Sequence, residues 1–115
     1  MAPAHIPHIH LDLPMPAIAE FCKRWQIREF ALFGSVLRED FRPDSDVDVL
    51  VTYMPTAHPS LFSLVQMEEE LKKILGRDVD LVDRLSVESS ENYIRRRNVL
   101  NSAIVICSAE ELNVA

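Results

Sequence analysis

The sequence has little glycine, little cysteine and no excess of basic charge, and each shortage narrows the class of protein it can encode. Two of its 115 residues are glycine and two are cysteine. Cys22 and Cys107 lie far apart in apolar surroundings without the spacing of a metal site, so we expect reduced core thiols; a disulfide is possible but nothing prompts it. The formal net charge of −6 argues against direct binding of nucleic acid.

Long apolar segments are missing as well. No segment approaches the roughly 20 residues of a membrane-spanning helix, and no signal peptide is visible. Hydrophobic residues make up 48% of the chain and charged residues 26%, which is ordinary for a globular protein in water. We therefore expect a cytoplasmic protein without membrane contact. Its single folded domain should cover residues 15–108, between a flexible leader at 1–14 and a tail at 109–115.

One of the two glycines occupies a position that suits phosphate binding. Residues 29–33 are apolar at most positions and predict a short buried strand, which runs directly into Gly34-Ser35. These two residues turn the chain into a helical start, where free backbone N–H groups can face an anion. Because Gly34 has no side chain, a phosphate could approach its backbone closely. This pattern predicts a phosphate-binding turn.

Two aspartates follow at a spacing that suits a metal ion. Residues 43–45 predict a turn and residues 46–51 a strand, along which side chains alternate. Asp46 and Asp48 should therefore share one face, about 6–7 Å apart along the backbone. Such a pair repels itself unless a cation binds it, and Mg²⁺ bound together with substrate phosphates fits this chemistry. The alternative is a turn and cap at 44–46, with Asp48 on the solvated face of an antiparallel strand.

The remaining elements predict an α/β fold of the α+β kind. Helices are expected at 16–26, 61–75 and 87–102, and further strands at 77–83 and 103–107. The strand at 77–83 again carries two aspartates at period two, Asp78 and Asp80, for which a solvated strand face is the alternative. We expect a small mixed β-sheet with aspartates on one rim and with the helices packed mainly on its other face.

Gly34-Ser35, followed after ten residues by Asp46-Val47-Asp48, resembles the signature of the DNA polymerase β-like nucleotidyltransferase superfamily. Over about residues 30–85 the chain is most similar to the minimal MNT branch. The resemblance implies a polymerase β-like fold in which Gly34 and Ser35 bind the nucleotide. The two aspartates would hold Mg²⁺.

Other residues take roles by the same resemblance. The third carboxylate of the family falls on Asp80, although the sequence leaves Asp78 open, and Arg38 would neutralise further phosphate charge. Two Mg²⁺ ions are implied, with Asp80 as a ligand and the candidate general base.

The resemblance also implies a reaction and a partner. The enzyme would transfer AMP from ATP to a hydroxyl, with release of pyrophosphate. Minimal MNT proteins act as antitoxins that adenylylate a tyrosine of a HEPN-domain ribonuclease toxin, so a hetero-oligomer with such a toxin is expected. Two alternatives remain open: an antitoxin that only masks its partner, and a nucleotidyltransferase for small molecules of the aminoglycoside type.

Overall fold

The computed structural model describes residues 13–37, 42 and 45–108. The helices and strands within them form an α+β fold around one sheet. The elements are α1 (Met15–Arg24), β1 (Ile27–Phe33), the 3₁₀ turn η1 (Gly34–Leu37), β2 (Val47–Tyr53), α2 (Leu61–Leu75), β3 (Val79–Asp83), α3 (Arg84–Glu88), α4 (Tyr93–Ser102) and β4 (Ile104–Ser108). The tail and most of the expected leader lie outside the described residues. Leu13, which the leader was expected to include, is buried in the core.

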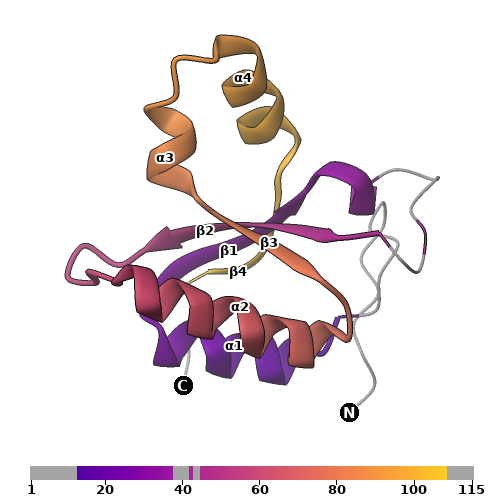
Figure 1. Cartoon of the computed structure of the whole chain (residues 1–115), viewed down its shortest axis with the longest axis vertical. Helices are drawn as coiled ribbons and strands as arrows, with labels where there is room; N and C mark the ends of the chain where they lie inside the picture. Colours follow the sequence, from indigo (N-terminus) through magenta and orange to yellow (C-terminus); the bar gives the residue numbers. More distant parts are fainter. Residues whose placement is uncertain (1–12, 38–41, 43–44, 109–115) are drawn as a thin grey trace.

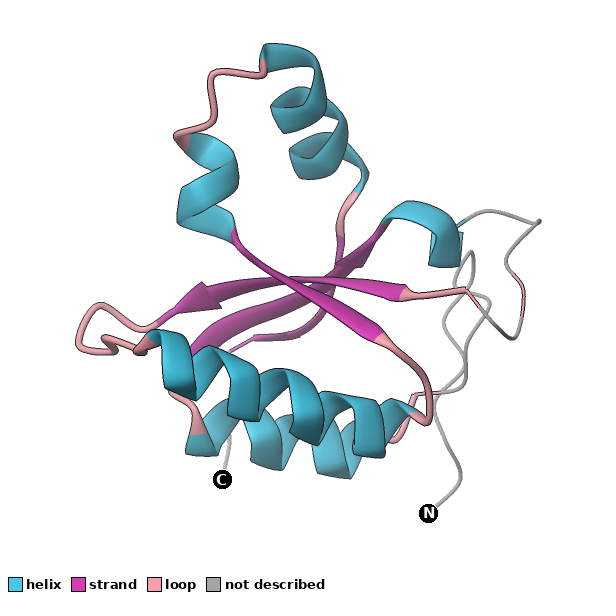
Figure 2. Ribbon diagram, in the orientation of Figure 1, coloured by secondary structure: helices cyan, strands magenta, loops and turns pink. Residues whose placement is uncertain are grey.

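The sheet is mixed, as the sequence predicts. Its strand order is β3-β2-β1-β4 (Figures 1 and 2). Strand β1 pairs antiparallel with β2 and with β4, whereas β2 and β3 run parallel and are connected through α2. No helix in the described part of the chain is both long enough and apolar enough to cross a membrane.

Helices α1 and α2 cover one face of the sheet (Figure 1). In α1, Ile18, Phe21 and Cys22 recur at helical spacing and are buried. Helix α2 contributes the buried side chains of Met67 and Leu71. The ends of α2 follow the sequence signals: Ser60 caps its start by accepting a hydrogen bond from Ser63, and Gly76 ends it at φ +71°. The larger of two hydrophobic cores lies between these helices and the sheet.

The prediction for residues 87–102 is wrong in the number of helices and in the face of the sheet on which they pack. The segment does not form one helix but belongs to two short ones, α3 and α4, with a break before Tyr93. Both lie on the opposite side of the sheet from α1 and α2 (Figure 1), where Val87 and Val99 pack on side chains of β1 and β2. The break has a local cause, because the Asn92 side chain caps α4 by accepting a hydrogen bond from the backbone of Arg95.

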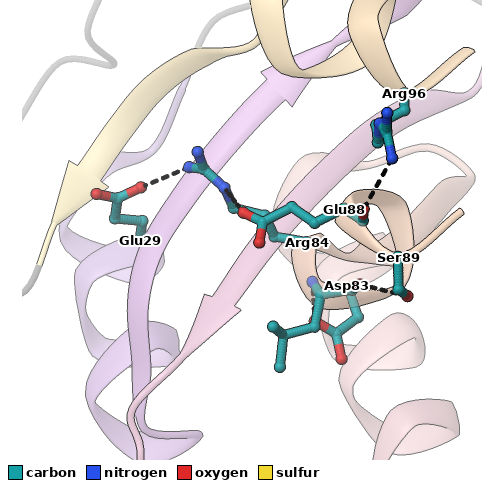
Figure 3. Close-up of polar contacts among 7 residues, drawn as sticks. Glu29, Asp83, Arg84, Glu88, Ser89 and Arg96 are labelled. Atoms are coloured by element: carbon teal, nitrogen blue, oxygen red, sulfur yellow. Dashed lines mark hydrogen bonds and ion pairs between the residues drawn. The ribbon is translucent and has the colours of Figure 1, made fainter. Parts of the chain in front are cut away.

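Charged side chains attach α3 to the sheet (Figure 3). Arg84 reaches Glu29 on β1 at 3.3 Å and also pairs with Glu88 within α3 at 2.8 Å. Asp83, the last residue of β3, caps α3 by accepting a hydrogen bond from the backbone of Leu85. The Arg96 side chain of α4 donates to the Glu88 carbonyl oxygen. The two short helices are thereby fixed over one face of the sheet.

Cys22 and Tyr53 should make the fold less stable at alkaline pH. Both cysteines are free and buried. Burial raises the pKa of Cys22 to about 12, with smaller contributions from the charge and the hydrogen bond of Cys107. Burial also raises the pKa of Tyr53 to about 12, assisted by Asp83. The folded protein therefore keeps protons that the unfolded chain loses above the ordinary pKa values of 9.0 and 10.0.

We expect the free energy of unfolding to decline at high pH for this reason. The stabilising contribution is complete below about pH 9 and is lost as the pH rises towards about 12. Tyr53→Phe removes one of the two titrating groups, so between about pH 8 and pH 11 its unfolding free energy should fall less than that of the wild type. Urea unfolding at both pH values measures the difference. Equal declines in the two proteins would contradict the assignment to Tyr53.

Candidate active site

Gly34 follows β1 as the first residue of η1 and lies directly against the carboxylate of Asp48. Its φ is +75°, a conformation that other residues rarely adopt. A Cβ atom at this position would collide with the Oδ2 atom of Asp48. The predicted helical start exists as the single 3₁₀ turn η1. Only glycine therefore fits here, because the Asp48 carboxylate occupies the space that a side chain would need.

Asp48 and Asp80 are brought together by the pairing of β2 with β3. The two residues are direct partners in the parallel register, and on its other side Asp48 is opposite Phe33 of β1. Neighbouring strands lie about 4.8 Å apart, so the two carboxylates stand side by side on the face that α3 and α4 cover. Asp48 is half-buried and Asp80 is exposed. The sequence-predicted alternation is confirmed for β2, because Val47 and Val49 point into the other core.

Asp46 is exposed and lies just before β2, in a segment tied to the start of β3. The backbone N–H of Val47 donates to the carbonyl oxygen of Asp78 at 2.9 Å. Farther out, the guanidinium of Arg77 donates to the carbonyl oxygen of Arg42 at 3.1 Å. The register pairs Asp80, and not Asp78, with Asp48. The entry to β2 is thus held beside the entry to β3, where the three predicted aspartates lie on neighbouring segments.

The donor set fits Mg²⁺ better than a metal held by protein groups alone. In residues 13–37, 42 and 45–108, no three His, Cys, Asp or Glu side chains form a ready-made metal site. Mg²⁺ does not need one, since it is usually bound by one or two carboxylates together with waters and substrate phosphates. Asp48 and Asp80 supply such a pair of hard oxygen ligands, and the Asp48 carboxylate lies directly against the backbone of Gly34.

Two predicted nucleotide-binding groups lie outside the described parts of the molecule. These are Arg38 and the side chain of Ser35. Their roles stay predictions.

Sequence reasoning missed the wall that α4 contributes to the site. A cavity of about 390 Å³ lies between η1 and α4, and its lining includes Gly34 itself. The lining residues from α4 are Asn98, Val99 and Ser102. Their spacing places them on one helical face, which was the available signal. That signal is weak because α4 is polar on most sides and the sequence does not show which face meets the sheet.

Comparisons with known proteins agree with this geometry. A family model described as a nucleotidyltransferase domain matches residues 16–106. The protein adenylyltransferase MntA of Thermococcus cleftensis is 41% identical over 70 residues, which cover 61% of this chain and 69% of that protein. The chain belongs to the nucleotidyltransferase family, since the family model spans most of its length. It is an enzyme of the MNT type, as the resemblance predicts.

Two solved structures share the fold. A chain in the crystal structure of a toxin–antitoxin pair with AMP-PNP has a TM-score of 0.64 at 20% identity, over 86% of this chain and 77% of that one. A chain in a structure of the tri-AMPylated Shewanella oneidensis HEPN toxin in complex with its MNT antitoxin has a TM-score of 0.57 at 19% identity, over 84% of this chain and 71% of that one. The predicted fold class is confirmed.

Proposed function

We propose that this nucleotidyltransferase transfers AMP from ATP to a tyrosine hydroxyl of a HEPN ribonuclease toxin and thereby neutralises it as a cytoplasmic antitoxin. The observation that carries the proposal is the position of Gly34 against Asp48, with Asp80 in register on the next strand. A glycine backbone suits close contact with phosphate, and neighbouring carboxylates suit Mg²⁺ bound together with that phosphate, so this arrangement supports metal-dependent nucleotidyl transfer.

The nucleotide would lie along the end of β1. The Gly34 backbone borders the terminal phosphates, and Ser35 and Arg38 add contacts to their oxygens. Asp46 and Asp48 are the proposed ligands of two Mg²⁺ ions, with Asp80 as a further ligand. When bound, Mg²⁺ neutralises phosphate charge and supports in-line displacement.

In the chemical step one P–O bond forms, one P–O bond breaks and one proton is transferred. The tyrosine oxygen attacks the α-phosphorus of ATP and forms a new P–O bond, while the bond between the α-phosphorus and the pyrophosphate oxygen breaks. Pyrophosphate leaves. Asp80 is exposed and is the register partner of Asp48 on the neighbouring strand. As general base it accepts the proton of the tyrosine hydroxyl.

The choice of a protein acceptor is supported by the relatives and by charge. The Thermococcus relative is named a protein adenylyltransferase, and in the Shewanella structure the HEPN toxin carries AMP groups in its complex with the antitoxin. The net charge of −6 disfavours a nucleic-acid acceptor, which would be repelled by this chain. A HEPN toxin is therefore the acceptor we propose.

Catalytic turnover tests this proposal. With ATP and Mg²⁺ present, an amount of this protein well below one equivalent should abolish the ribonuclease activity of a co-expressed HEPN partner. The reason is that each molecule can modify many toxin molecules in succession. The control omits ATP. Neutralisation that needs one full equivalent and proceeds equally well without ATP would instead identify a protein that only masks its partner.

A further inference from the structure

Helices α3 and α4 form a hairpin, residues 84–102, on the same side of the sheet as the predicted active site (Figure 1). Between its two helices and β3 lies a cavity of about 170 Å³, which we call the hairpin cavity. Its lining residues are Val82, Ser86, Val87, Ser90 and Arg95. The proposed reaction assigns no role to the hairpin cavity.

The hairpin cavity begins close to Asp80. Alternate residues of a strand face opposite sides of the sheet. In β3, Val79 and Leu81 pack in the core with α1 and α2, whereas Val82 packs in the core with α3 and α4. Val82 therefore shares its face with Asp80 and lies about 6–7 Å farther along the strand. An acceptor whose hydroxyl reaches Asp80 thus lies beside the hairpin.

The guanidinium of Arg95, which lines the hairpin cavity, is not engaged within the described part of the chain. Arg95 makes no side-chain hydrogen bond or ion pair with any residue there. The neighbouring Arg96 differs, because it donates to the carbonyl oxygens of Glu88 and Ser90, the first of which Figure 3 shows, and lies over the Tyr93 ring. Arg96 therefore holds the hairpin together, whereas the charge of Arg95 is available to a ligand.

Two serine hydroxyls line the same cavity. The Ser86 hydroxyl has no hydrogen-bond partner among the residues that the structure describes. The Ser90 hydroxyl accepts from the backbone N–H of Asn92, which leaves its own hydrogen free to donate. A guanidinium together with two hydroxyl donors suits a carboxylate. The hairpin cavity therefore fits one acidic side chain.

Large exposed apolar side chains flank the cavity residues in sequence. Leu85 precedes Ser86 on α3, and Tyr93 and Ile94 precede Arg95 on α4. Their exposed fractions are 68%, 58% and 71% in that order. Exposed apolar and aromatic side chains grouped with an arginine are typical of a protein interface. Such a surface complements a segment in which apolar side chains flank an acidic residue.

A second group of exposed apolar side chains, Leu61, Phe62 and Val65, lies at the start of α2. Helix α2 is on the other side of the sheet from the hairpin and from the face of Asp80 (Figure 1). The chain as a whole has a net charge of −6, yet residues 84–102 contain four arginines and two glutamates. Of the two apolar surfaces, the hairpin alone is both basic and close to Asp80.

We infer that the acceptor protein docks on the α3–α4 hairpin through a segment in which apolar side chains flank an acidic residue. The inference rests on the proposed function for the presence of a protein acceptor. The carboxylate of that residue enters the hairpin cavity and pairs with Arg95, while the apolar side chains contact Leu85, Tyr93 and Ile94. Docking here brings a hydroxyl of the acceptor to Asp80. Arg95 is thus a positioning residue that helps to select the protein to be modified.

Arg95→Glu tests the charged part of this contact. The variant should raise the KM for a HEPN partner by about tenfold or more, because its carboxylate repels the acidic residue, and should leave ATP affinity unchanged. Arg95→Lys keeps the charge and should restore most of the affinity for the partner. Lys73→Glu is the matched control, since Lys73 is exposed on α2 and the variant changes the net charge equally. An equal rise in KM in Lys73→Glu would overturn the inference, because net charge alone would explain it.

Ile94→Ser tests the apolar part. Loss of a buried apolar contact should raise the KM for the partner by about tenfold. Phe62→Ser is the matched control, because Phe62 is also 71% exposed but lies at the start of α2. Its KM should equal that of the wild type. Wild-type KM values in folded Arg95→Glu and Ile94→Ser would overturn the inference.

Calorimetry of partner binding without ATP separates this inference from the proposed function. Partner binding that depends on Arg95 in a protein that transfers no AMP would support the inference and contradict the proposed function. AMP transfer with a partner affinity independent of Arg95 and Ile94 would do the reverse. A dimer of this chain alone that Ile94→Ser dissociates would assign the surface to a second copy and overturn the inference. Failure of the wild type to bind the partner would overturn both.

Discussion

Gly34→Val should abolish detectable binding of ATP and also destabilise the fold. Any Cβ at this position meets the Asp48 carboxylate, so the side chain must displace that group from its place in the site. The positive φ of +75° adds backbone strain of about 1–3 kcal/mol for a residue other than glycine. Ser35→Ala should be milder, since the loss of one hydrogen bond to a charged oxygen costs about 1.5–3 kcal/mol of binding. Calorimetry with Mg²⁺ and ATP measures both effects.

The second glycine provides the control for this experiment. Gly76 also has a positive φ, +71°, but nothing lies within 4 Å of a Cβ built on it. Gly76→Val should therefore lower the free energy of unfolding through strain at the end of α2 and leave ATP affinity unchanged. Equal ATP affinity in the wild type and in folded Gly34→Val would contradict the placement of the phosphates at Gly34.

The double substitution Asp46→Asn and Asp48→Asn should reduce Mg²⁺-dependent transfer below detection while the protein still folds. Asparagine keeps the size of the side chain but removes the charge that holds a divalent cation. A Tm close to that of the wild type would show that the fold is intact. Transfer retained by the folded double variant would exclude these two residues as ligands.

A second pair of substitutions decides between the aspartates near β3. Asp80→Asn should lose transfer as well, because Asp80 is the register partner of Asp48. Asp78→Asn should keep most of it, since Asp78 precedes β3 and contributes a backbone carbonyl to the pairing of the strands. Loss of transfer in Asp78→Asn alone would move the third ligand to that residue.

Local sequence signals predicted much of the fold and the part of the site that β2 contributes. Helix α2 begins after Ser60 and ends before Gly76, as predicted, because an N-cap and a left-handed glycine act within one turn of the helix. The alternation of apolar and acidic residues placed Asp48 on the face opposite Val47 and Val49. In both cases the residues that decide the structure are neighbours in sequence.

Other features depend on contacts between distant segments. The partnership of Asp48 with Asp80 follows from the parallel register of β2 and β3, which are joined only through α2. The cavity arises because residues of α4 come beside the β1–η1 segment, and the polar sequence of α4 does not reveal which of its faces is buried. The start of α4 could have been found, since Asn92 is a favourable N-cap. The proposed limits of the domain, 15–108, remain a prediction.

The mass of the partner protein tests the central claim most directly. A HEPN partner is incubated with ATP, Mg²⁺ and either the wild-type chain or Asp48→Asn, and its intact mass is then measured. We predict that the wild type adds whole AMP units to a partner tyrosine and that the Asp48→Asn variant adds none and fails to protect. An unmodified partner that a folded Asp48→Asn chain neutralises as well as the wild type does would contradict the account.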